Sequence, residues 1–195
     1  MRRIRTAGAV LALGLAGCGG GGSDAGGSVE AALCGPYPPQ ATSPYVLPFQ
    51  VGQAYLVSQG NCSHGSHRAG SKAQYAYDFS MPIGTPVVAS RDGTVLFVQV
   101  GFANNNTAAD QETNLIFVEH EDGTVAGYVH LKQDGAFVAI GDDVRRGDLI
   151  GSSWNALHFQ VTQCLQCETV AVTFLNTSPH PDGLVKGEIY TAETY

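Results

Sequence analysis

Residues 114–130 read Asn-Leu-Ile-Phe-Val-Glu-His-Glu-Asp-Gly-Thr-Val-Ala-Gly-Tyr-Val-His. β-Branched, aromatic and other apolar residues alternate with polar or small ones on both sides of the Asp122-Gly123 pair. An Asp-Gly pair between two such runs is a strong signal for a tight turn, because glycine adopts positive φ without strain. This stretch therefore predicts a β-hairpin with strands at Asn114–His120 and Thr124–His130.

From Tyr45 onward the chain consists of short apolar runs separated by Gly, Pro, Asp and Asn, and signals for helices are scarce. Asp92-Gly93 is a second hairpin signal, and the polar residues Gly101–Thr113 predict a surface loop. Residues Gly183–Tyr195 fit either a final strand or a loose tail. Many short strands at close spacing predict an all-β protein, either an antiparallel sandwich or a set of curled antiparallel sheets. The further strands that we expect are Ala54–Val57, Ala76–Phe79, Pro86–Ala89, Gly93–Val100, Leu149–Gly151, Leu157–Thr162 and Val170–Phe174.

The first residues have the composition of an export signal. Three arginines, Arg2, Arg3 and Arg5, precede a short apolar stretch that ends in Leu15-Ala16-Gly17-Cys18. Small residues before a cysteine are typical of a bacterial lipobox, in which the cysteine is lipidated; an ordinary signal peptide with a chance cysteine is the alternative. We therefore expect a lipoprotein signal peptide at residues 1–18, a flexible tether at 19–33, where glycine and serine are frequent, and one folded domain at 34–195. Lipidated Cys18 would attach the domain to a membrane.

The charge and the cysteines agree with an exported protein. The formal net charge of -7 argues against binding to nucleic acid, which needs a basic surface. Four cysteines besides Cys18 form an even set, as disulfides in an oxidising compartment require. We favour the pairs Cys34–Cys62 and Cys164–Cys167. Half of a zinc knuckle is the competing interpretation of Cys164 and Cys167, but the sequence has no second pair of that kind.

Three positions could carry metal chemistry. Asp78 lies between aromatic residues in an apolar strand, where a buried carboxylate is costly unless it is paired or binds a metal ion. His158 alternates with apolar neighbours, so that Ala156, His158 and Gln160 share one face. In the strand that ends at His130, alternation places Tyr128 and His130 on one face. Two histidines and a carboxylate would suit catalytic zinc. A turn-capping aspartate and surface histidines are the alternatives.

The sequence resembles the lysostaphin-type zinc metallopeptidases of bacterial cell walls in four ordered blocks. These blocks cover roughly residues 66–174, which is nearly the whole expected domain. Four blocks in the family's order are more specific than any one of them. The blocks are Tyr77–Val95, His120–Thr124 with Tyr128–Leu131, Val138–Gly151, and Leu157–Val161.

The resemblance implies antiparallel sheets that form a groove with one zinc ion on its floor. By motif position the zinc ligands are His67, Asp78 and His158, with His64 as the reserve candidate for the first. The family's catalytic histidine in the tyrosine-x-histidine-leucine strand corresponds to His130. The first histidine of the family's histidine-leucine-histidine-phenylalanine motif is replaced by Ala156.

Two functions follow from the resemblance. One is a zinc endopeptidase of the cell envelope that cuts peptide cross-links of peptidoglycan, with a rate reduced by Ala156. The other is a non-catalytic module that binds peptidoglycan or activates a partner hydrolase. We expect a monomer at the periplasmic face of an outer membrane or on another extracytoplasmic surface. A structural β-domain with accidental histidines is a third hypothesis, and it would bind no metal.

Overall fold

The computed structural model describes residues 34–103 and 113–195. The predicted signal peptide, Cys18 and the tether lie outside the described residues, as does most of the predicted loop Gly101–Thr113. The helical elements of the described part are two short 3-10 turns, η1 (Gln40–Thr42) and η2 (Gly65–His67). No helix within these residues has the length and the apolar character that a bilayer span requires.

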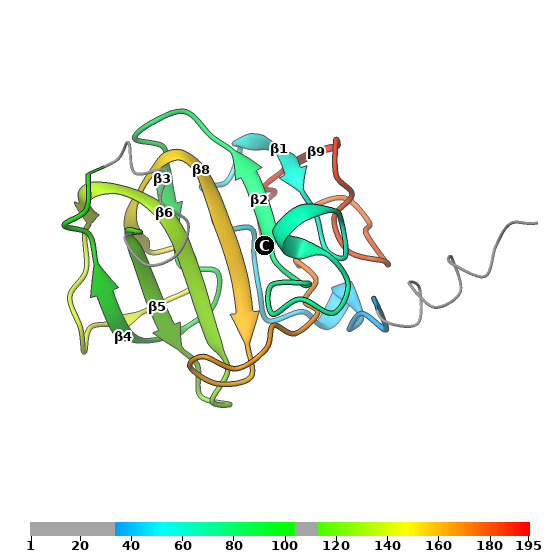
Figure 1. Cartoon of the computed structure of the whole chain (residues 1–195), viewed down its shortest axis with the longest axis horizontal. Helices are drawn as coiled ribbons and strands as arrows, with labels where there is room; N and C mark the ends of the chain where they lie inside the picture. The colour runs from blue at the N-terminus through cyan, green and yellow to red at the C-terminus, as the bar shows by residue number, and fades with distance from the viewer. Residues whose placement is uncertain (1–33, 104–112) are drawn as a thin grey trace, which may run out of the picture.

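One antiparallel sheet contains all nine strands of the described residues (Figure 1). Its strand order is β7-β4-β5-β6-β8-β2-β1-β9, and β3 also pairs with β8. The prediction of an all-β antiparallel fold is therefore confirmed, with the strands joined in a single hydrogen-bonded sheet. The strands are β1 (Ala54–Gln59), β2 (Tyr77–Ser80), β3 (Pro86–Val88), β4 (Gly93–Gln99), β5 (Leu115–Glu119), β6 (Val125–Ala136), β7 (Asp143–Val144), β8 (Leu149–Thr162) and β9 (Ile189–Thr191).

The hairpin predicted around Asp122-Gly123 is present as the antiparallel pair β5–β6. The second hairpin signal, Asp92-Gly93, was wrong about the pairing. The strand before it, β3, pairs with β8, whereas the strand after it, β4, pairs with β5 and β7. A turn signal specifies only a local change of direction, and the strand partners are chosen by the rest of the sheet.

The predicted strands Leu149–Gly151 and Leu157–Thr162 are parts of one strand, β8. Residues between them remain extended because neighbouring strands supply hydrogen-bond partners along the whole length: β3 pairs with the first part of β8, β2 with its central part, and β6 with both ends. β8 consequently lies at the centre of the sheet. Its buried residues Leu157, Phe159 and Val161 face the core.

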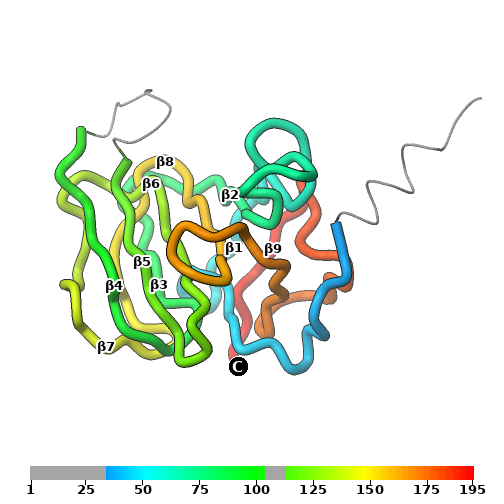
Figure 2. The backbone as a smooth tube through the Cα atoms, turned by 60° about the horizontal axis from the view of Figure 1, so that its bottom comes forward, coloured from blue at the N-terminus to red at the C-terminus, as the bar shows by residue number. Residues whose placement is uncertain are grey.

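Residues Val170–Phe174 do not form the strand that we predicted. Their backbone groups find partners outside a ladder: the amide of Phe174 donates to His180 Nε2, and the carbonyl of Thr173 accepts from the Ser43 hydroxyl. In Figure 2 this orange segment leaves the sheet toward the N-terminal residues drawn in blue. The strand alternative for Gly183–Tyr195 is confirmed in part, because β9 adds an edge strand beside β1.

Both predicted disulfides are present, Cys34–Cys62 and Cys164–Cys167. The first spans 28 residues of sequence and ties the start of the described chain to the segment between β1 and β2. The second closes a tight turn just after β8. Each bridge is formed within the chain, as an even set of cysteines predicted.

Candidate metal centre

Asp78 and His158 are brought together by the central strands of the sheet. They are direct cross-strand partners in the β2–β8 pair, and the Oδ1 atom of Asp78 lies 2.8 Å from Nδ1 of His158. Directly opposite residues on one face of an antiparallel pair have neighbouring side chains. Both side chains are mostly buried, with 21% and 14% of their surface exposed. The register of two strands therefore suffices to place a carboxylate beside an imidazole.

His67 reaches the same point from a loop. It is the last residue of η2 and is completely buried. Its Nε2 atom lies 3.2 Å from His158 Nδ1 and 3.6 Å from Asp78 Oδ1. The other candidate for this position, His64, is exposed and lies outside this group. The structure thus brings together the three residues named from the resemblance and leaves the reserve candidate at the surface.

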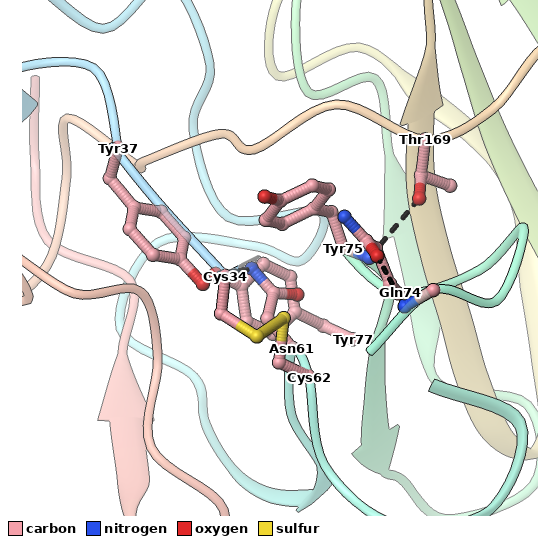
Figure 3. Close-up of a disulfide and its surroundings, with 9 residues drawn as sticks. Cys34, Tyr37, Asn61, Cys62, Gln74, Tyr75, Tyr77 and Thr169 are labelled. Carbon is pink, nitrogen blue, oxygen red and sulfur yellow. Dashed lines mark hydrogen bonds between the residues drawn. A yellow bond between two sulfur atoms is a disulfide. The ribbon is translucent and has the colours of Figure 1, made fainter. Parts of the chain in front are cut away.

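The loop that carries His67 is fastened at both ends (Figure 3). We call residues 62–74 the His67 loop, because the amide of Cys62 donates to the carbonyl of Gln74 at 2.7 Å and closes it. The Cys34–Cys62 disulfide holds one end. At the other end, Thr169 accepts a hydrogen bond from the amide of Tyr75 and donates one to the carbonyl of Lys72. These contacts compensate for the absence of strand pairing around His67.

Asn61 completes this anchor from the side of β1. In the amide orientation that satisfies all its partners, its side-chain carbonyl accepts from the hydroxyls of Tyr37 and Tyr77, and its amino group donates to the carbonyls of Tyr75 and Ala76 at 2.9 Å. One side chain therefore connects the N-terminal segment, the start of the His67 loop and the start of β2. The backbone on both sides of His67 is held by hydrogen bonds.

The donor atoms of this group fit a tetrahedral zinc ion. Zinc–nitrogen and zinc–oxygen bonds of about 2.0–2.1 Å in a tetrahedron place the ligand atoms about 3.3 Å apart. The observed separations between the three donor atoms are 2.8, 3.2 and 3.6 Å. Two imidazoles and one carboxylate are also the ligand types of catalytic zinc sites, which keep a fourth position for water or substrate.

Gln160 orients the ring of His158. Its Oε1 atom accepts a hydrogen bond from His158 Nε2 at 3.1 Å, which leaves Nδ1 as the nitrogen directed at Asp78 and His67. The predicted alternation along β8 holds, because Ala156, His158 and Gln160 are half-buried while the residues between them are buried on the other face. The sequence analysis placed Gln160 on this face without giving it a role. The spacing of an amide two residues after the histidine is the signal that could have indicated one.

The charges of this group support each other. Burial lowers the pKa of His67, against the opposing effect of the Asp78 carboxylate. For Asp78, desolvation alone would raise the pKa, but the hydrogen bond and the charge interaction with His158 outweigh it and lower the pKa. A neutral imidazole and an ionised carboxylate are the protonation states that metal ligation requires.

His130 faces the donor group because β6 is irregular there. Its ring centroid lies 6.0 Å from that of His158, and its φ is 64°. The predicted alternation, with Tyr128 and His130 on one face, was wrong. Tyr128 is fully buried in the core, and the register shift after Val129 turns His130 to the opposite face. An irregularity of this kind commonly re-aims a side chain at a functional site.

His130 is more accessible than the three donors. The residue is exposed, and Thr113 Oγ1 lies 3.5 Å from its Nδ1 atom. Desolvation lowers the pKa of His130 and the nearby His158 adds to this effect, while Asp78 opposes it. Solvent weakens these effects because the residue is exposed. A neutral imidazole in this position can accept a proton.

Ala156 is directly opposite Ser80 in the β2–β8 pair and shares the face of His158. Neither side chain has a nitrogen that could exchange protons near neutral pH. His130 is consequently the histidine that stands beside the donor group without belonging to it.

Two imidazoles and a carboxylate on the face of an antiparallel sheet, with another histidine beside them, are the arrangement of a mononuclear metallohydrolase. Comparison with known families gives the particular one. Residues 72–172, more than half of the chain, match the model of peptidase family M23, and the chain belongs to this family. The match includes Asp78, His130 and His158 but begins after His67, which only the fold brings to the other two.

Two curated relatives are similar to part of the chain. An uncharacterized metalloprotease of Buchnera aphidicola subsp. Baizongia pistaciae is 36% identical over 91 residues, which are 43% of this chain and 22% of the relative. The peptidoglycan DD-endopeptidase ShyA of Vibrio cholerae is 37% identical over 78 residues, 40% of this chain and 16% of the relative. The chain thus spans about a fifth of these proteins or less.

Among solved structures, the catalytic domain of the antimicrobial peptidase lysostaphin from Staphylococcus simulans is 29% identical, with a TM-score of 0.39. The similarity covers 56% of this chain and 79% of that domain.

Proposed function

We propose that this chain is a zinc-dependent endopeptidase-like protein of the cell envelope that acts on peptide cross-links of peptidoglycan. The observation that carries the proposal is the group formed by His67, Asp78 and His158, whose donor atoms lie within 4.8 Å of one another. Membership of peptidase family M23 and the similarity to a peptidoglycan DD-endopeptidase support the substrate class.

In this proposal His67 Nε2, Asp78 Oδ1 and His158 Nδ1 hold the zinc ion. Zinc in such a site supplies Lewis acidity, which activates water and polarises a peptide carbonyl. His130 accepts the proton of the attacking water at a ring nitrogen and returns it to the leaving amine. Thr113, next to Nδ1 of His130, limits the orientations of that ring.

Ala156 makes the rate low. The family's second catalytic histidine would stand at this position, and an alanine side chain can neither transfer a proton nor donate a hydrogen bond to a developing oxyanion. Loss of one such group costs about 10² to 10⁴ in rate. The same observation favours a second candidate function, a non-catalytic module that binds peptidoglycan or activates a partner hydrolase.

The location of the protein is part of the proposal. Lipidation of Cys18 would hold the domain at the periplasmic face of an outer membrane or at another extracytoplasmic surface, where peptidoglycan is within reach of a flexible tether. Two intramolecular disulfides agree with an oxidising compartment.

Hydrolysis of purified peptidoglycan by the zinc-loaded protein tests both candidates, with newly released amino groups counted over time. We expect slow release by the native chain, none by His158→Ala, and release faster by about 10² to 10⁴ for Ala156→His. Asn155→His is the matched control, because it adds a histidine at the neighbouring, exposed position, which strand alternation turns away from His158.

The outcomes separate the two candidates. Release that Ala156→His alone produces would assign the native chain to binding or regulation. A native rate that His158→Ala leaves unchanged would contradict a zinc endopeptidase altogether.

A further inference from the structure

Four residues form a row across four neighbouring strands, beginning beside the metal centre. Ala156 in β8 is directly opposite Ser80 in β2, Ser80 is opposite Leu56 in β1, and Leu56 is opposite Ile189 in β9. Directly opposite residues point to the same face of a sheet. We call Ala156, Ser80, Leu56 and Ile189 the lateral row; strands β2, β1 and β9 stand next to one another in Figure 1.

The lateral row lies on the face that carries the metal centre. Ser80 follows Asp78 by one full period of β2, and Ala156 precedes His158 by one period of β8, so all four share a face. Burial agrees, since the intervening residues are buried in the core: Val57, Phe79, Leu157 and Tyr190.

The outer half of the lateral row is exposed and apolar. Leu56 is 38% exposed and Ile189 is 65% exposed, and they are paired directly across β1 and β9. Ser80 and Ala156 are small, so no large side chain of the row separates this apolar half from the donor group. The residues beside it on the same face of β1 and β9, Ala54 and Thr191, are also exposed and uncharged.

The outer strands of the row lie outside the part of the chain that matches the family. β1 and β9 precede and follow residues 72–172, and they extend the sheet beyond β2, the strand that carries Asp78. The replacement of a family histidine by Ala156 opens the inner end of the row. The row is therefore a feature of this chain in particular.

We infer that the lateral row binds an extended, uncharged peptide segment of the substrate next to the bond at the metal centre; this rests on the function proposed above. Three strand spacings of about 4.8 Å give a row about 14 Å long, which matches about four extended residues. The peptide crosses the strands, with a small side chain such as that of alanine over Ala156 and Ser80 and apolar groups over Leu56 and Ile189.

Substitution of the two exposed apolar residues by aspartate tests this inference. The probe is a mixture of cross-linked muropeptides released from peptidoglycan by a muramidase, and the dissociation constant is measured for each variant by calorimetry. We expect Leu56→Asp and Ile189→Asp to bind about tenfold more weakly, because a charge must be desolvated where an apolar contact is lost. Ile140→Asp is the control, since Ile140 is 62% exposed but lies outside the row, near β7.

Zinc content and melting temperature are recorded for every variant, and they should match the native protein because the substituted side chains are exposed. Where an aspartate variant unfolds, Leu56→Ser and Ile189→Ser replace it. A shift of backbone amide signals of Leu56 and Ile189 on titration with muropeptides is expected in the native protein.

Equal dissociation constants for all variants would overturn the lateral row and leave the proposed function standing. Native protein that binds no muropeptide would overturn the proposed function, and the row as a substrate site with it. Conversion of a dimer to a monomer by Leu56→Asp, seen by sedimentation, would show that this face joins two copies and would also overturn the inference.

Discussion

Asp78 and His158 face each other across β2 and β8, with 2.8 Å between Oδ1 and Nδ1. The backbone ladder between two central strands sets this distance. The third donor, His67, depends instead on a loop that is closed by one backbone hydrogen bond and held by a disulfide. The metal centre therefore has a rigid half in the sheet and a half whose position depends on the contacts of the His67 loop.

Removal of a donor should abolish binding of zinc at this centre. We expect His67→Ala and His158→Ala to lose the single equivalent of zinc that the native protein retains on dialysis, because two remaining ligands bind weakly. His64→Ala should retain it, since His64 is exposed and outside the group. Atomic absorption on dialysed protein measures this, and loss of zinc in His64→Ala with retention in His67→Ala would reverse the assignment.

Gln160 should tune the affinity for zinc without being a ligand. Gln160→Ala removes the acceptor of the His158 Nε2 hydrogen bond, and loss of such a partner typically lowers metal affinity about 10- to 100-fold. Gln160→Glu keeps an acceptor and should stay close to native. Competition with a coloured chelator gives the affinities, and the NMR signals of the His158 ring report whether Nε2 still carries the proton. Identical affinities in Gln160→Ala and native protein would exclude this role.

The two disulfides should differ in their effect on stability and on the metal. By loop-closure entropy, a bridge spanning 28 residues contributes about 3.5 kcal/mol and one spanning 3 residues about 2 kcal/mol. Cys34→Ser with Cys62→Ser should therefore destabilise more than Cys164→Ser with Cys167→Ser in urea unfolding. Only the first pair should also weaken binding of zinc, because it releases an end of the His67 loop. An equal loss of zinc affinity in both double variants would count against the anchor.

The stability of the metal-free protein should fall as the pH decreases below about 6.5, the ordinary pKa of histidine. Burial lowers the pKa of His180, whose Nε2 accepts from the Phe174 amide while Nδ1 lies 2.8 Å from the carbonyl of Ser178. The unfolded chain then binds a proton that the folded chain does not, so the free energy of unfolding decreases with decreasing pH. Urea unfolding between pH 7.5 and 5.5, with a chelator present, measures this slope.

His180→Gln should be less stable at pH 7.5 and should show a smaller slope, because one titrating group is gone. His120, whose pKa burial also lowers, accounts for part of the remaining slope. His64→Gln is the control at an exposed position. A slope that His180→Gln leaves unchanged would show that this buried ring does not contribute.

Local patterns predicted much of the fold. The hairpin around Asp122-Gly123 follows from two alternating runs and one turn, all within seventeen residues of the quoted stretch. The face shared by His158 and Gln160 follows from the two-residue period of an extended strand. Both depend on interactions between residues that are close in sequence, or on a geometry that every strand shares.

The failures have long-range causes. The segment Val170–Phe174 has the residues of a strand, but its backbone is bound by Ser43 and His180, which the sequence places far from a sheet partner. His130 turns to the metal side because the pairing of β6 with β8 shifts after Val129. Alternation alone assumes regular pairing, so it predicted the wrong face for His130.

The sequence by itself determined the all-β class, the two cysteine pairs and the residue types that a metal centre needs. These features depend on composition, turn chemistry and strand period, which are local properties of the chain. Only the tertiary structure decided that His67 rather than His64 joins Asp78 and His158, that an irregular strand aims His130 at them, and that Leu56 and Ile189 continue the face of the site. Such juxtapositions depend on the register between strands and on how a loop is held, and no residue specifies these without its distant partner.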